Sequence, residues 1–170
     1  MSISRPPSPP LRILGIDPGF DRTGIGIVDV RGSDATWVFH GCIQTSPKDE
    51  FSFRLQSVRN ELQEIIRLHQ PVCAVIEQLF FQNNAKTAIK VGMARGVSML
   101  AAADAGLAIV ELTPNQVKQG IAGWGGADKR AVQEMVQRFL HLSEIPKPDD
   151  AADALALAIV GGLIHRRSVL

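Results

Sequence analysis

The sequence predicts an α/β protein with a mixed five-stranded sheet: a three-strand antiparallel meander followed by two parallel strands, flanked by helices. Three strand-like runs joined by short turns open the chain, and helical periodicities alternating with two short apolar runs follow. A chain of 170 residues with 45% hydrophobic content can bury one substantial core. We therefore expect one domain over residues 11–166, preceded by a flexible, proline-rich tail of residues 1–10.

The meander is expected from three strand-like runs at residues 11–16, 24–30 and 35–43. An Asp-Pro-Gly turn closes the first run, and short connections join all three. Short connections of this kind favour antiparallel neighbours.

Helices and two further strands follow the meander. Residues 53–69 place apolar side chains on one helical face, 73–77 form a short apolar strand, 85–105 form an Ala-rich helix, and 108–112 form another strand. Because a helix separates the last two strands, they are expected to be parallel.

The C-terminal part is predicted to be helical. Thr113, Pro114 and Gln116 form a helix start, with an N-cap, a proline at the first position and a capping box. A Gly-rich loop over 120–126 then leads into a helix over 128–140, and a final helix begins near Asp149.

Composition limits the classes of function. The formal net charge is +1, so any affinity for nucleic acid must come from where the basic side chains lie. Cys42 and Cys73 fall in apolar runs and are interpreted as reduced thiols. No run approaches the roughly 20 apolar residues of a membrane span, and residues 1–10 do not resemble a signal peptide, so we expect a cytoplasmic protein without a membrane partner.

Four carboxylates stand where predicted elements begin or end. Asp17 follows the first strand, where it could simply serve the turn, and Glu77 ends an apolar strand, where it could equally face solvent. Asp150 and Asp153 share one face of the final helix, where acidic residues commonly compensate the helix dipole. Residues 154–160 are apolar nearly all round, however, and a buried helix with two carboxylates at its start is hard to explain by capping alone.

Taken together, these carboxylates predict a metal site. Two strand ends and a helix start can converge at one edge of a sheet, where four carboxylates would repel each other unless cations intervene. Mg²⁺ prefers carboxylate and water oxygens, and two such ions about 4 Å apart can catalyse phosphodiester hydrolysis. The sequence offers no nucleophile signature, and its histidines are scattered without metal-ligand spacing; they are His40, His69, His141 and His165.

Five motifs resemble the bacterial Holliday-junction resolvase family RuvC, and together they are specific. They are Gly15-Ile16-Asp17-Pro18-Gly19 with Thr23-Gly24, Ile76-Glu77-Gln78-Leu79-Phe80, Gly92-Met93-Ala94-Arg95-Gly96-Val97, Gln116-Val117-Lys118-Gln119, and Asp150-Ala151-Ala152-Asp153-Ala154-Leu155-Ala156. The match runs in order from about residue 11 to residue 165.

The resemblance implies a ribonuclease-H-like fold and a homodimer that binds a four-way DNA junction. Each subunit would nick one of two like-polarity strands with Mg²⁺ or Mn²⁺, leaving 5′-phosphate and 3′-hydroxyl ends, in recombination and repair with the RuvA–RuvB branch-migration complex. The implied metal ligands are Asp17, Glu77, Asp150 and Asp153. Lys118 would lie near the scissile phosphate, Lys129 would contact DNA, and Phe80 would stack on a base.

Further basic residues are candidate DNA contacts. The set comprises Lys86, Lys90 and Arg95 on the Ala-rich helix, and Lys118, Lys129 and Arg130 around the Gly-rich loop. Each alone could be an ordinary solvated side chain, but their grouping favours a phosphate track. Lys118 could also stabilise charge on the reacting phosphate. Gly92 and Gly96, one helical turn apart, favour either packing on the sheet or a dimer seam.

Three other interpretations compete with this one. A nucleotide-binding ATPase of the actin and sugar-kinase superfamily shares the Asp-Gly strand end, but it needs a second related domain. A non-catalytic junction-binding module would not need all four carboxylates, and another ribonuclease-H-like nuclease would lack the lysine and phenylalanine motifs. Asp149 could replace Asp150 as the partner of Asp153; the family spacing selects Asp150 and leaves Asp149 as the N-cap.

Overall fold

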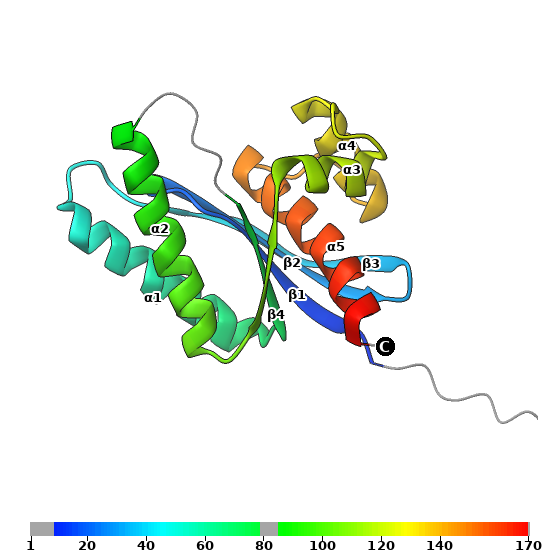
Figure 1. Cartoon of the computed structure of the whole chain (residues 1–170), viewed down its shortest axis with the longest axis horizontal. Coiled ribbons are helices and arrows are strands. Elements are labelled where there is room, and N and C mark those ends of the chain that lie inside the picture. The colour runs from blue at the N-terminus through cyan, green and yellow to red at the C-terminus, as the bar shows by residue number, and fades with distance from the viewer. Residues whose placement is uncertain (1–8, 79–84, 170) are drawn as a thin grey trace, which may run out of the picture.

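The computed structural model describes residues 9–78 and 85–169, and its centre is a mixed five-stranded sheet (Figure 1). The strands are β1 Leu11–Asp17, β2 Arg22–Arg31, β3 Asp34–Gln44, β4 Cys73–Glu77 and β5 Ala108–Leu112, in the order β3-β2-β1-β4-β5. β1 and β3 are each antiparallel to β2, whereas β4 is parallel to both β1 and β5. The predicted meander and the two parallel strands are therefore confirmed.

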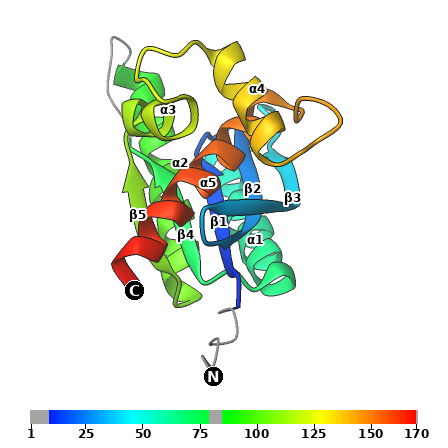
Figure 2. The ribbon, with the colours of Figure 1, turned by 90° about the vertical axis from the view of Figure 1, so that its right-hand side faces the viewer.

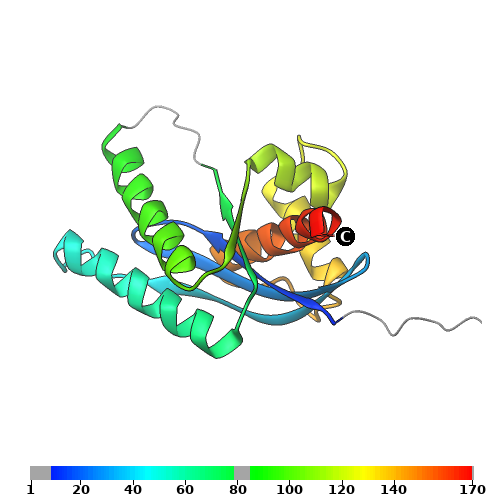
Figure 3. The same cartoon turned by 60° about the horizontal axis from the view of Figure 1, so that its bottom comes forward.

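Five helices cover the two faces of the sheet in the described part of the chain. They are α1 Phe51–His69, α2 Ala85–Asp104, α3 Pro114–Ala122, α4 Lys129–Phe139 and α5 Asp149–Val169. α1 and α2 lie on one face, whereas α5 lies on the other with α3 and α4 outside it (Figure 1, Figure 3). One apolar core fills each interface, and both use side chains of β1 and β2 because successive residues of a strand face opposite sides.

Helix α5 determines where the functional residues lie. It crosses β1 and β2 at close range (Figure 2), and every residue from Ala154 to Val160 is buried. Glycines permit this approach, since a Cβ at Gly15 would lie 1.9 Å from the main-chain oxygen of Ala154. The prediction that this apolar helix is largely buried is confirmed, and its first turn is brought to the end of the sheet that carries Asp17.

Two local predictions at helix ends need correction. α3 extends to Ala122 and therefore includes Gly120, which was expected to begin the loop. Its Cα faces Val160 of α5, where an added Cβ would come within 2.5 Å of a methyl carbon, so packing against α5 requires a glycine there. Asp149 is the first residue of α5, so it lies inside the helix and not at the N-cap position, and its carboxylate accepts a hydrogen bond from Gln133 of α4.

The capping and cysteine predictions agree with the structure. Thr113 caps α3, and its capping box with Gln116 is complete, with hydrogen bonds of 3.1 Å and 2.8 Å. Cys42 and Cys73 are free thiols, and Cys73 is fully buried. No helix within the described ranges is long and apolar enough to cross a membrane.

Candidate active site

Asp17 and Glu77 lie side by side at one end of the sheet. Each is the last residue of its strand, and β1 and β4 are parallel neighbours in which Ile16 pairs with Ile76. Asp17 and Glu77 directly follow this pair, so the two carboxylates lie next to each other at the carboxyl ends of β1 and β4. Ligand sites of sheets with parallel strands commonly lie at these ends.

The first turn of α5 brings two more carboxylates to the same place. Asp17 pairs with Gly24 across β1 and β2, and a Cβ at Gly24 would lie 1.9 Å from the main-chain oxygen of Asp150. The backbone of Asp150 is thus packed directly on the strand next to Asp17. Asp153 follows one helical turn later, and its charge acts on both Asp17 and Glu77. The structure therefore brings the four predicted carboxylates to one edge.

Mutual repulsion and burial disfavour ionisation of these groups. The pKa of Asp17 is raised to about 7, first by burial and then by the charges of Glu77, Asp153 and Asp150. Burial also raises the pKa of Glu77, with a further contribution from Asp153, while Lys118 acts in the opposite direction. The pKa of Asp153 is raised by burial as well, although Lys129 opposes this. Such a group of carboxylates is an electrostatic site for a cation.

Two basic side chains already contact members of this group. Arg22 Nε lies 2.8 Å from Asp150 Oδ2. Lys129 Nζ lies 3.3 Å from Asp153 Oδ2 and 3.3 Å from Asp149 Oδ2. Among the described residues, no three His, Cys, Asp or Glu side chains are grouped so that they could hold a metal ion in this arrangement. The carboxylates share one edge, but two of them are turned toward cations.

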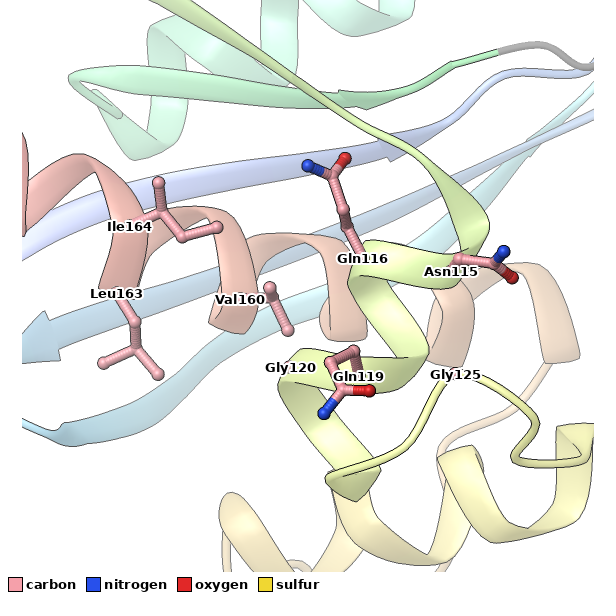
Figure 4. A pocket seen from close by; sticks show the side chains of 8 residues that line it. All are labelled: Asn115, Gln116, Gln119, Gly120, Gly125, Val160, Leu163 and Ile164. Carbon is pink, nitrogen blue, oxygen red and sulfur yellow. The ribbon is translucent and has the colours of Figure 1, made fainter.

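A cavity of about 270 Å³ opens beside this edge. Its charged lining consists of the carboxylates of Glu77 and Asp153 and the ammonium groups of Lys118 and Lys129, and α3, α4 and α5 supply its apolar lining. A larger cavity of about 490 Å³ lies between α3 and the C-terminal half of α5 (Figure 4). Its lining contains amides and apolar groups but no charged side chain, so we place the chemistry at the smaller cavity.

The other predicted DNA contacts lie in different surroundings. Arg95 donates a hydrogen bond to the Glu77 carbonyl oxygen and pairs with Glu111, and Arg130 pairs with Glu134 along α4. Lys90 lies over the rings of Phe20 and Phe51, at 5.5 Å and 5.4 Å from their centres. The side chain of Lys86, on the first turn of α2, and all of Phe80 lie outside the described residues.

Sequence reasoning missed two basic residues around the carboxylates. Arg22 and Lys147 line an open cavity of about 700 Å³ together with Lys129, Asp149 and Asp150. Arg22 stands five residues after Asp17, beyond the turn, and Lys147 precedes the final helix by two residues. The only available signal was this proximity to motif residues, and proximity in sequence does not give the direction of a long side chain.

The donor set at this edge fits a hard divalent cation. The candidate ligands Asp17, Glu77, Asp150 and Asp153 offer carboxylate oxygens only, which suits Mg²⁺ and Mn²⁺ better than softer metals. The raised pKa of Asp17 supports the same conclusion, since a cation would relieve the repulsion that disfavours its ionised form. The fold and this edge define a class of protein, the ribonuclease-H-like nucleases.

Comparison with known proteins identifies the family within this class. The family model described as crossover junction endodeoxyribonuclease RuvC matches residues 13–161. The RuvC of Ruminiclostridium cellulolyticum is 49% identical over 158 residues, which cover 93% of this chain and 95% of that protein. The RuvC of Pelotomaculum thermopropionicum is 51% identical over 147 residues, covering 86% and 90%.

A solved structure agrees with these sequence relatives. T. thermophilus RuvC in complex with a Holliday junction substrate superposes with a TM-score of 0.88 at 34% identity, covering 93% of this chain and 96% of that one. The chain belongs to the RuvC family of crossover junction endodeoxyribonucleases.

Proposed function

We propose that this protein resolves four-way DNA junctions by Mg²⁺-dependent hydrolysis of one phosphodiester in each of two like-polarity strands. The observation that carries the proposal is the convergence of Asp17, Glu77, Asp150 and Asp153 at one edge of the sheet. The T. thermophilus relative, which shares the fold and a third of the sequence, was solved with a Holliday junction substrate. The products would be 5′-phosphate and 3′-hydroxyl ends that a ligase can join.

The four carboxylates are the proposed metal ligands. Bound Mg²⁺ would supply Lewis-acid activation of water and of the phosphodiester. The protein's contribution is to hold two carboxylates on rigid strand ends and two on the first turn of a buried helix. Mn²⁺ should substitute, because it accepts the same oxygen donors.

Lys118 is the proposed catalytic cation of the protein itself. It lines the same cavity as Glu77 and Asp153, and its charge already acts on Glu77. A preorganised ammonium at this position would stabilise negative charge that develops on the reacting phosphate. Lys129 lines the same cavity and would contact DNA when a phosphate group competes with Asp153 for its ammonium.

The remaining DNA contacts are proposed from their position in the sequence and fold. Lys86, Lys90, Arg95 and Arg130 would guide the DNA backbone, and Phe80, three residues after Glu77, would stack on a base at the crossover. Among these, Arg95 and Arg130 already form ion pairs with Glu111 and Glu134, so their proposed contribution to phosphate binding is the smaller one.

A homodimer is proposed because two strands must be cut. α2 exposes an apolar stripe: Ile89 is 62% exposed, Met93 51% and Leu100 54%, and a Cβ at Gly96 would meet nothing within 4 Å. These positions follow one another at helical spacings of four, three and four residues, as in the seam between two packed helices. A two-fold dimer through this stripe would present two active sites to one junction.

The wider setting follows from this activity. A junction resolvase acts on chromosomal DNA during recombination and repair, which places the proposed site of action in the cytoplasm of a bacterial cell. The proposed partner is the branch-migration complex of RuvA with RuvB, which would deliver the junction.

The test uses a labelled four-way junction with Mg²⁺, and it compares the wild type with Asp153→Asn. We expect paired, symmetric nicks from the wild type, and junction binding without nicking from the variant. Asp34→Asn is the matched control, since Asp34 is an exposed aspartate at the start of β3 in the hairpin remote from this edge.

Each competing function predicts a different result. Junction binding without nicking by the wild type would indicate a binding module. Equal cleavage of linear duplex or of an RNA–DNA hybrid would indicate another nuclease of this class. Equal nicking by the wild type and by Asp153→Asn would refute the catalytic assignment.

A further inference from the structure

We propose that Arg22 is a positioning residue of the carboxylate centre: its guanidinium orients the Asp150 side chain for binding of the divalent cation. This role rests on the proposed function, because it takes Asp150 to be a metal ligand. It adds a residue that none of the sequence motifs includes, and it predicts a direct effect on metal affinity.

The geometry of β2 brings Arg22 to Asp150. Arg22 and Gly24 are two residues apart on this strand, so both project from the same face of the sheet. At Gly24 this face touches the first turn of α5, where an added Cβ would lie 1.9 Å from the Asp150 main-chain oxygen and 3.0 Å from its Cβ. The Arg22 side chain therefore leaves the strand beside Asp150, and the distance between Nε and Oδ2 is 2.8 Å.

A thiol lies on the same face of the sheet as Arg22. Cys42 of β3 pairs with Gly24 of β2, so its thiol lies on the same face, beside the guanidinium. The Cys42 thiol donates a hydrogen bond of 3.6 Å to the Ile43 carbonyl oxygen, so its sulfur can only be a weak acceptor for the guanidinium. The guanidinium thus lies between a thiol and a carboxylate that belong to two different elements of the fold.

The ion pair contributes little to overall stability but constrains Asp150. The two side chains are 47% and 30% exposed, and ion pairs at such positions add little to the free energy of folding. Aspartate has a short side chain, however, so fixing one carboxylate oxygen fixes its rotamer and leaves the other oxygen available. Loss of the hydrogen-bonding partner of a ligating side chain typically lowers metal affinity by about 10–100-fold.

Arg22 also lines an open cavity with Lys129 and Lys147, where a DNA phosphate could be bound instead. A phosphate contact would change junction affinity and leave the metal affinity of the free protein unaltered. The two roles are therefore separable by experiment. We favour positioning because Arg22 contacts the Asp150 carboxylate directly, with 2.8 Å between Nε and Oδ2.

The experiment measures Mn²⁺ binding to the full-length protein, by electron paramagnetic resonance of the free ion, for wild type, Arg22→Gln, Arg22→Lys and Arg31→Gln. We expect the Kd for Mn²⁺ to rise at least about tenfold in Arg22→Gln, with partial recovery in Arg22→Lys. Arg31 is exposed at the opposite end of the same strand, so its variant should bind like the wild type. In nicking assays, Arg22→Gln should need more Mg²⁺ for half-maximal rate, while its rate at saturating Mg²⁺ stays near that of the wild type.

Two outcomes would overturn the proposal. The first is an Mn²⁺ affinity of Arg22→Gln equal to or tighter than that of the wild type. The second is a loss of junction affinity in EDTA with unchanged Mn²⁺ affinity, which would make Arg22 a phosphate contact. A wild-type protein that binds Mn²⁺ but does not nick junctions would refute the proposed function alone, because the comparison of Mn²⁺ affinities would still decide the role of Arg22.

Discussion

Arg95 of α2 donates a hydrogen bond from Nε to the main-chain carbonyl oxygen of Glu77, over a distance of 3.0 Å. The same guanidinium pairs with Glu111 of β5, and its side chain is only 18% exposed. Arg95 therefore connects the helix with the exposed apolar stripe to the strand end that carries a candidate metal ligand. Its Nε and Nη2 donors are therefore directed at the protein, whereas a phosphate contact requires donors directed at solvent.

Replacing Arg95 with Gln should therefore impair catalysis more than DNA binding. We expect the nicking rate to fall about tenfold or more, because small displacements of a positioned catalytic group are costly. Junction affinity measured in EDTA by gel shift should change little. Glu111→Gln is the control, since it removes the ion pair but leaves the bond to Glu77. A loss of junction affinity as large as the loss of rate would indicate that Arg95 contacts a DNA phosphate.

The raised pKa of Asp17 predicts an unusual dependence of stability on pH. Below about pH 4 both the folded and unfolded states carry the proton, and above about pH 7 neither does. Between these values the folded state retains a proton that the unfolded state has lost, so stability falls as pH rises. A pKa raised from 3.8 to about 7 corresponds to a loss of about 4 kcal/mol across this window.

Asp17→Asn should remove this loss. In EDTA at pH 8 we expect the variant to be more stable than the wild type by roughly 2–4 kcal/mol, with the difference vanishing near pH 4. Urea unfolding followed by circular dichroism measures both values, and Asp34→Asn, which keeps Asp17, should lose stability with rising pH as the wild type does. Equal stability of Asp17→Asn and wild type at pH 8 would mean that the carboxylates do not destabilise the fold.

Most of the fold could be predicted because its signals are local. The apolar run over 154–160 and the capping box at Thr113 each depend on a few neighbouring residues, and the structure confirms both. The convergence of Asp17 and Glu77 also followed, because they end neighbouring parallel strands. Gly120 shows the limit: its low helix propensity suggested a loop, but packing against α5 keeps it helical.

The contacts of the long polar side chains around the site could not be predicted. The pairing of Arg22 with Asp150 joins residues that are far apart in the chain, and the carboxylate of Asp149 accepts a hydrogen bond from Gln133 of α4. Similarly, residue spacing did not indicate that the Lys90 ammonium lies over the ring of Phe20. Such contacts depend on rotamers and tertiary distances, which residue spacing does not determine.

Lys118→Met should separate chemistry from binding. We expect the nicking rate to fall about 100-fold or more, as when other preorganised stabilising groups are removed. Junction affinity in EDTA should fall only modestly, because a single phosphate contact is lost. Since Lys118 lowers the pKa of Glu77, the pH profile of residual nicking should also move to higher pH. Arg67→Met, on the last turn of α1, is the control for the loss of one positive charge. Parallel losses of junction affinity and nicking rate in Lys118→Met would argue against a catalytic role for Lys118.

The apolar stripe on α2 predicts that one charge can dissociate the dimer. Met93 lies in the middle of the stripe and is 51% exposed, so Glu at this position would be tolerated in the monomer but would be desolvated in a helix seam. We expect the dimer Kd of Met93→Glu, measured by sedimentation equilibrium, to rise about 100-fold or more. Leu68→Glu is the matched control, because Leu68 is 60% exposed on α1 outside the stripe.

At concentrations where Met93→Glu is monomeric, the two nicks in a junction should appear independently. An unchanged dimer in Met93→Glu would place the interface on another surface, because a buried carboxylate at the centre of this seam could not leave its affinity intact.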